Sequence, residues 1–109
     1  MNAPNPRQEI EKTIAAGDLP KLLEMTCVLH GHFCPGIAMG VKAAARAVKE
    51  LSTSSTGMEE IIAIVETNNC FSDGVQFVTG CSFGNNALIY RDYGKTAFTL
   101  ARRNGEAVR

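Results

Sequence analysis

The sequence predicts an α+β domain in which N-terminal helices pack on a mainly antiparallel β-sheet. In the first half of the 109-residue chain, apolar residues recur three or four positions apart, which is the period of a helix. A continuous β-branched run follows at 61–65, and the remainder alternates apolar and polar residues around turn signals. Helices that precede the strands, rather than alternating with them, favour the α+β class. We expect a single domain over 1–109, with residues 1–6, rich in Pro and Asn, disordered.

The first two helices are delimited by glycines and by one capping aspartate. The first is expected over 7–16, with Gly17 at the position where a left-handed residue ends a helix. Asp18 can cap the second helix. Gly31 then ends that helix and leaves His30 on its last turn. The inner side of the second helix is expected to consist of Leu19, Leu22, Leu23, Thr26 and Leu29.

A third helix is expected from Pro35 to about Leu51, with Cys34 at its N-cap position. Its core side comprises Ile37, Val41, Ala44, Val48 and Leu51. A second side carries only small residues, namely Gly36, Gly40, Ala43 and Ala47. Glycine inside a helix costs about 1 kcal/mol relative to alanine. We therefore expect this side to let another backbone approach closely, either inside the domain or in a dimer.

The second half begins with a polar loop at 52–57 and the apolar run at 61–65. Because all five residues of that run are apolar, we expect a strand that is buried on both faces. A short helix over 72–79 follows, and then a loop rich in Gly and Asn over 80–86.

Strands are expected at 88–91 and 96–101, arranged about a turn at 92–95. The dipeptide Asn104-Gly105 is typical of a two-residue hairpin turn. The four residues after it are then the start of the returning strand.

Charge and hydropathy exclude several classes of partner. Eleven Lys and Arg residues balance eleven Asp and Glu residues, so the formal net charge is zero. A neutral chain argues against a nucleic-acid partner and against electrostatic binding to an anionic membrane. No apolar run approaches the about 20 residues that span a bilayer, and the first residues lack the apolar segment of a signal peptide. We therefore expect a cytoplasmic protein.

The chain has four cysteines. Because the cytoplasm keeps thiols reduced, we expect these cysteines to be metal ligands or reactive groups rather than disulfides. No two of them form a Cys-x-x-Cys pair, so neither a zinc finger nor a thioredoxin-like motif is indicated.

The segment 29–36 reads Leu-His-Gly-His-Phe-Cys-Pro-Gly and holds both histidines of the chain. Imidazole and thiolate are strong ligands of Zn²⁺ and of neighbouring metals. A helix end followed by a tight glycine turn can direct His30, His32 and Cys34 to one point. The start of the third helix also favours the thiolate form of Cys34. The alternative is a histidine that caps helix carbonyls beside a cysteine that acts as a small buried apolar residue, without a metal.

The other cysteines differ in how strongly they point to the same site. Cys70 leaves the buried strand, where ligand positions are common, and Asp73 lies three residues further on. Taken alone, Cys70 is equally explained as a core residue and Asp73 as a charge at a helix N-terminus. Cys81 lies in the Gly-rich loop and either approaches the same site or is simply buried in a tight turn. Cys27, on the second helix near its apolar side, is assigned to the core.

Five stretches in one order carry a family resemblance. They are His-Gly-His-Phe-Cys-Pro-Gly at 30–36, Met-Gly-Val at 39–41, and the segments 69–76, 79–88 and 91–98. Over residues 20–103 the chain resembles the FmdE family of formylmethanofuran dehydrogenase proteins. This resemblance implies an α+β domain that forms a homodimer, with a metal site in a cleft. It implies His32, Cys34 and Cys70 as ligands, with His30, Asp73 and Cys81 close by. Many relatives carry a C-terminal Cys-rich zinc module, which has no counterpart here because no Cys follows Cys81.

Three functions stay open at this point. The first is a metal-dependent enzyme or redox accessory protein, with Cys34 and Asp73 as the catalytic candidates and Asp73 as the base. The second is a metal carrier, and the third is a structural component of a larger dehydrogenase complex. We favour a metal-binding domain with an accessory or redox-linked role that holds a divalent transition metal, Zn²⁺ ahead of Fe or Ni. The candidate ligands are His30, His32, Cys34, Cys70 and Cys81. A closed set of four ligands would favour the structural component.

Overall fold

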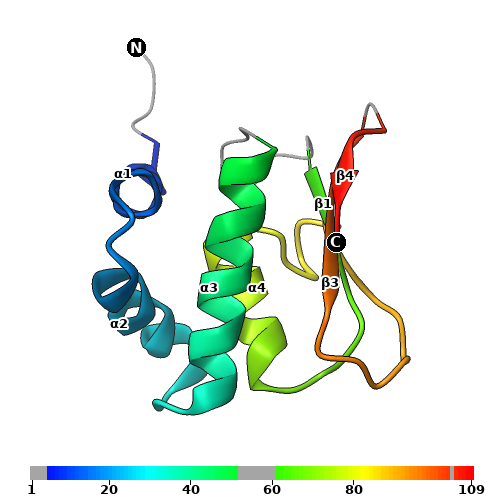
Figure 1. Ribbon diagram of the computed structural model, residues 1–109, viewed down its shortest axis with the longest axis horizontal. Coiled ribbons are helices and arrows are strands. Elements are labelled where there is room, and N and C mark those ends of the chain that lie inside the picture. Colours follow the sequence, from blue (N-terminus) through cyan, green and yellow to red (C-terminus); the bar gives the residue numbers. More distant parts are fainter. Residues whose placement is uncertain (1–4, 52–60, 104) are drawn as a thin grey trace.

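The computed structural model describes residues 5–51, 61–103 and 105–109. Its helices are α1 (Gln8–Ala16), α2 (Leu19–His30), α3 (Pro35–Glu50) and α4 (Cys70–Thr79). Its strands are β1 (Ile61–Val65), β2 (Leu88–Tyr90), β3 (Phe98–Arg102) and β4 (Ala107–Val108). Figure 1 shows three layers, with α1 and α2 on one side, α3 and α4 in the middle, and the sheet on the other side. The expectations for residues 1–4, for the 52–57 loop and for Asn104 concern positions outside the described ranges.

The sheet has four strands in the order β2-β1-β3-β4. Strand β1 pairs parallel with β2 and antiparallel with β3, and β3 pairs antiparallel with β4. The sheet is therefore mixed and mostly antiparallel, which confirms the predicted α+β class. Helix α4 connects the two parallel strands and packs against β1 as a crossover connection.

The strands at 88–90 and 98–102 do not form the predicted hairpin with each other, because β1 lies between them. Ala63 of β1 is opposite Leu88 on one side and opposite Leu100 on the other. The chain between the two outer strands crosses the end of β1. There Arg91 N–H donates to the Val65 carbonyl and Lys95 N–H donates to the Glu66 carbonyl. The most apolar strand thus takes the central position, and its last carbonyls are satisfied by the crossing segment.

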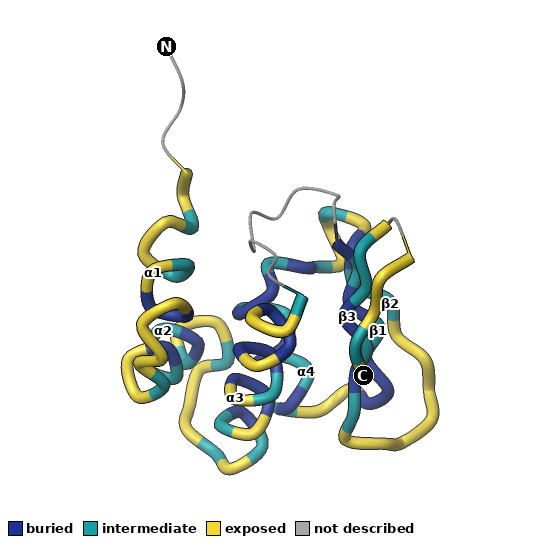
Figure 2. The backbone as a smooth tube through the Cα atoms, turned by 45° about the horizontal axis from the view of Figure 1, so that its top comes forward, coloured by how far each residue is buried: buried dark blue, intermediate teal, exposed yellow. Residues whose placement is uncertain are grey.

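Strand β1 is buried on one face only. Ile61, Ala63 and Val65 are buried, whereas Ile62 and Ile64 on the other face are half-buried. The prediction of burial on both faces is therefore wrong, since the described helices pack against one side of the sheet (Figure 2). The core lies between these helices and the sheet and includes Val41, Val48, Val75, Val78, Phe98 and Leu100.

The helix boundaries follow the predicted capping residues closely. Gly17 and Gly31 both adopt the left-handed conformation at the ends of α1 and α2, and the Asp18 side chain accepts the Lys21 N–H. Helix α4 begins two residues earlier than predicted because the Asn69 side chain caps it. Along α2, Leu22 and Thr26 are buried as expected, but Leu29 is exposed because the last turn of the helix reaches beyond the core.

Helices α3 and α4 pack in direct backbone contact through glycines. A Cβ atom on Gly40 would collide with the Phe71 carbonyl oxygen, and one on Gly74 would lie 2.7 Å from the Val41 nitrogen. The small side of α3 therefore serves a close approach within the domain. Because these glycines lie in the first half of each helix, the contact also holds the two helix N-termini side by side.

In the described residues, no helix has the length and apolar character needed to cross a membrane.

Candidate metal centre

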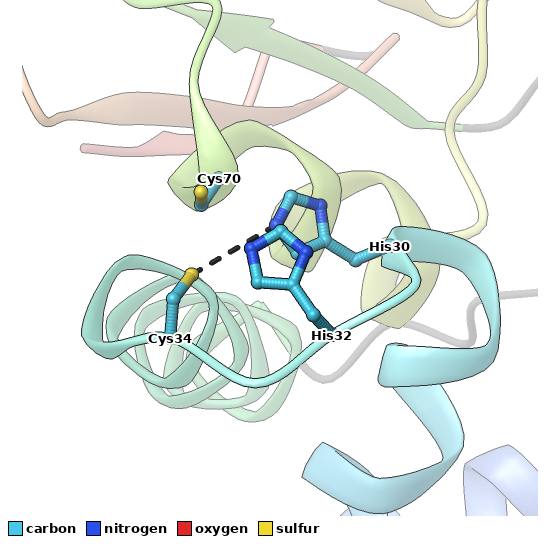
Figure 3. A group of neighbouring side chains, drawn as sticks. All are labelled: His30, His32, Cys34 and Cys70. Atoms are coloured by element: carbon cyan, nitrogen blue, oxygen red, sulfur yellow. Dashed lines mark hydrogen bonds between the residues drawn. The ribbon is translucent and has the colours of Figure 1, made fainter.

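Four side chains from three helix ends converge on one point. His30 is the last residue of α2, His32 lies in the following connection, Cys34 caps α3, and Cys70 is the first residue of α4 (Figure 3). One nitrogen or sulfur atom of each residue lies within 4.8 Å of the corresponding atoms of the other three. We call these residues the His/Cys group. The structure thus brings together four of the five predicted ligands.

The glycine between the two histidines shapes this arrangement. Gly31 has a φ of 93°, a left-handed conformation that other residues rarely adopt, and its N–H donates to the Cys27 carbonyl. The chain therefore reverses sharply at the end of α2. As a result the rings of His30 and His32 lie next to each other, with centroids 4.4 Å apart.

Asp73 orients the first histidine. Its Oδ2 atom lies 2.7 Å from His30 Nδ1, while His30 Nε2 lies 3.8 Å from Cys34 Sγ. An ionised carboxylate only accepts hydrogen bonds, so Nδ1 is the donor and the neutral ring carries its lone pair on Nε2, toward the group. This hydrogen bond is also the main reason why the pKa of His30 is raised. A carboxylate behind a metal-ligating histidine is a common arrangement in metal sites.

The two sulfurs differ in their electrostatic environment. Cys34 Sγ accepts the Ile37 N–H at 3.4 Å, and this bond, followed by one from the Cys70 thiol, lowers the pKa of Cys34. The pKa of Cys70 is raised, chiefly by the same hydrogen bond to Cys34 and then by burial. Without a metal the proton is thus shared unequally, with Cys34 as the more acidic thiol. Binding of a metal would require both sulfurs to lose their protons.

The group fits a tetrahedral divalent metal. Zn–S bonds of about 2.3 Å and Zn–N bonds of about 2.0 Å place neighbouring ligand atoms about 3.3–3.8 Å apart. The His30 Nε2 to Cys34 Sγ distance of 3.8 Å already lies in this range. The largest separation in the group, 4.8 Å or less, needs side-chain adjustments of about 1 Å. Two nitrogens and two sulfurs are a donor set typical of zinc, which iron and nickel also accept.

The structure corrects the placement of Cys81. This residue follows the C-terminal end of α4, whereas Cys70 begins it, and a ten-residue helix is about 15 Å long. Cys81 is 1% exposed, and its thiol points to the Ile61 carbonyl, 3.9 Å away. Burial raises the pKa of Cys81. Cys81 is therefore a core residue and does not approach the His/Cys group.

The remaining candidates take the following positions. Cys27 is half-buried on α2 and lies outside the His/Cys group, as expected, with its pKa raised by burial. Asp73 lies next to the group, but as the hydrogen-bond partner of His30 rather than as a free carboxylate. Sequence reasoning missed this pairing. Its signal was the position of Asp73 on the first turn of α4, three residues after Cys70.

The fold and the site together define a small α+β domain whose two histidines and two cysteines can hold a metal ion. The family model of FmdE, described as "Molybdenum formylmethanofuran dehydrogenase operon", matches residues 29–109. The chain belongs to this family. The matched segment includes all four members of the His/Cys group.

A curated relative from Archaeoglobus fulgidus (strain ATCC 49558) is named "Probable S-adenosyl-L-methionine-binding protein". It is 48% identical to this chain over 89 residues, which make up 78% of this chain and 24% of that protein. The chain thus spans about a quarter of the length of this relative.

Proposed function

We propose that this domain binds one divalent transition-metal ion through His30, His32, Cys34 and Cys70, with Zn²⁺ as the best match. The observation that carries this proposal is the approach of four donor atoms from three helix ends to within 4.8 Å of one another. Two further contacts support it. Asp73 holds His30 with its Nε2 atom toward the group, and the Ile37 N–H stabilises negative charge on Cys34. A bound metal ion would supply Lewis acidity and would cross-link α2, α3 and α4.

We further propose that this metal-binding domain has an accessory, redox-linked role in the cytoplasm, as a homodimer or within a larger dehydrogenase complex. The family description, which refers to a formylmethanofuran dehydrogenase operon, supports the link to an oxidoreductase. Exposed apolar side chains beside the centre support a protein partner, since Val28 is 86% exposed and Phe33 is 64% exposed. S-adenosylmethionine binding is not part of this proposal, because the matched segment is 24% of the relative named for it.

A metal-dependent enzyme is the second candidate, and the exposure of one ligand favours it. His32 is exposed, whereas His30, Cys34 and Cys70 are half-buried. His32 is therefore the ligand that water or a substrate can replace most easily, which would provide the open position of a catalytic site. In this case Asp73 acts as the positioning residue of His30. To act as the base it would first have to release its 2.7 Å contact with that ring.

The test of metal binding is the metal content per chain of protein purified without a histidine tag. We expect about one ion per chain in the wild type and in Cys27→Ser, which serves as the matched thiol control. Cys34→Ser and Cys70→Ser should lose the ion. Equal metal content in Cys34→Ser and Cys27→Ser would remove Cys34 from the site and overturn the proposal.

The coordination number then separates the two roles. X-ray absorption at the metal edge should show two sulfurs and two nitrogens for a closed site in an accessory domain. For an enzyme, the nitrogen contribution of His32 should be replaced by oxygen when a substrate or water binds, and His32→Ala should retain the ion with weaker affinity.

A further inference from the structure

We propose that Cys34 and Cys70 also form a redox-active dithiol, which exchanges with small disulfides and closes an intramolecular Cys34–Cys70 disulfide when no metal is bound. This inference rests on the proposed function only in that both use the same two sulfurs. It assigns to the centre a thiol–disulfide exchange chemistry in addition to metal binding.

The distance between the two sulfurs is the first support. Both belong to the His/Cys group, so they lie at most 4.8 Å apart. A disulfide bond is about 2.05 Å long, so side-chain rotation has to bring the sulfurs closer by at most about 2.7 Å. The two cysteines come from different helices and face each other across the N-termini of α3 and α4 (Figure 3).

The backbone around the pair allows this approach. A Cβ atom on Gly36 would lie 3.0 Å from Cys70 Cβ and 4.0 Å from Cys34 Sγ, so a larger residue there would enter the space between the two cysteines. The glycine contacts between Gly40 and Gly74 hold the two helices at this short distance. The pair is therefore preorganised by helix packing and does not depend on a mobile loop.

Accessibility and local hydrogen bonds distinguish this pair from the other thiols. Cys34 and Cys70 are half-buried, whereas Cys81 is fully buried and points to a backbone carbonyl. Cys34 Sγ accepts a backbone N–H at the start of α3, an arrangement that stabilises a negatively charged sulfur. We therefore expect Cys34 to be the attacking sulfur and Cys70 to be the resolving one.

The exchange proceeds in two balanced steps. In the first, the Cys34 thiolate attacks one sulfur of a small disulfide R–S–S–R. A mixed disulfide Cys34–S–S–R forms, and the first R–S⁻ leaves and takes up a proton from solvent. In the second, the Cys70 sulfur gives up its proton and attacks the Cys34 sulfur, which releases the second R–S⁻. Overall, two protein thiols are oxidised to one disulfide and R–S–S–R is reduced to two R–SH.

This chemistry excludes metal binding by the same group, because a sulfur in a disulfide no longer has the thiolate that serves as the ligand. A bound metal should in turn protect both thiols from exchange. Oxidation and metal release are therefore expected to occur together.

The experiment treats metal-free protein with glutathione disulfide and counts free thiols, followed by peptide mapping without reduction. The wild type has four thiols, and we expect two to remain, with Cys34 and Cys70 in one cross-linked peptide pair. Cys27→Ser is the matched control and should lose two of its three thiols. Cys70→Ser should lose one of its three thiols, as a glutathione adduct on Cys34.

Three outcomes would overturn the proposal: four unreacted thiols in the wild type, glutathione adducts on both cysteines without a cross-link, or a Cys27–Cys34 cross-link. Because the mapping is done on the wild type, it does not depend on the folding of a variant. It also does not depend on metal binding. A protein that forms the disulfide but never holds a metal would refute only the proposed function, and a metal-binding protein that forms no disulfide would refute only this inference.

Discussion

His30 Nδ1 lies 2.7 Å from Asp73 Oδ2, and this contact joins the last residue of α2 to the first turn of α4. It orients the imidazole so that Nε2 is directed at Cys34 Sγ. Asp73 thereby acts on the metal centre without being a ligand. Two elements that are far apart in the sequence depend on this one hydrogen bond for the geometry of the centre.

We expect Asp73→Asn to weaken metal binding by about 10- to 100-fold, because an amide holds a ligating histidine less well than a carboxylate does. Competition with a chromophoric chelator measures this affinity. The matched control is Asp92→Asn, since Asp92 accepts a hydrogen bond from the exposed Tyr90 hydroxyl and is not in the His/Cys group. Equal affinities of the two variants would show that Asp73 does not position His30.

The contact between α3 and α4 gives a prediction about stability. Gly40→Ala should lower the free energy of unfolding by about 1–3 kcal/mol, because the added Cβ would overlap the Phe71 carbonyl oxygen. In an unconstrained helix the same substitution would be stabilising by about 1 kcal/mol. Urea denaturation measures the difference. Gly84→Ala is the control, since its Cβ would have no neighbour within 4 Å, and a Gly40→Ala variant as stable as this control would contradict the described packing.

The local elements of the fold were predictable, because each depends on residues close in sequence. Gly17, Asp18 and Gly31 mark helix ends through their own backbone conformation or side-chain hydrogen bonds. The insertion of β1 between β2 and β3 was not predictable in this way. Strand order depends on which strand buries the most apolar surface and on which backbone groups the crossing segment satisfies, and both are properties of the folded chain.

The same distinction applies to the centre. His30, His32 and Cys34 lie within five residues, so a single turn brings them together. Cys70 joins them because α3 and α4 contact each other through glycines, a feature for which the sequence offers the small side of α3 as its signal. Cys81 carried no comparable signal, and its position was decided by the direction in which the chain leaves α4.

Metal binding should stabilise the folded protein, because the four ligands come together only in the native state. At a free Zn²⁺ concentration 100 times the dissociation constant, the free energy of unfolding should rise by about 2.7 kcal/mol. Thermal unfolding with added Zn²⁺ or with a chelator measures this shift. Cys34→Ser should unfold at the same temperature under both conditions, and a zinc-dependent shift in that variant as large as in the wild type would place the metal elsewhere.

The ion pair between Glu66 and Arg109 predicts how stability depends on pH. The Glu66 carboxylate is buried and accepts two hydrogen bonds from the Arg109 guanidinium, at 2.8 and 2.9 Å. These bonds lower the pKa of Glu66, against the opposing effect of burial. In the unfolded chain a glutamate titrates at about pH 4.3.

Because the folded pKa of Glu66 is the lower one, the ionised pair contributes stability above about pH 4.3. This contribution is lost as the pH falls from that value through the folded pKa. We therefore expect Arg109→Gln to be less stable than the wild type at pH 7, with a difference that shrinks as the pH falls below about 4. Urea denaturation of both proteins between pH 7 and the acid limit tests this, with Arg46→Gln as the control, since Arg46 pairs with Glu50 on an exposed part of α3. A difference between Arg109→Gln and the wild type that stays constant down to the acid limit would mean that Arg109 acts through packing and not through the charge of Glu66.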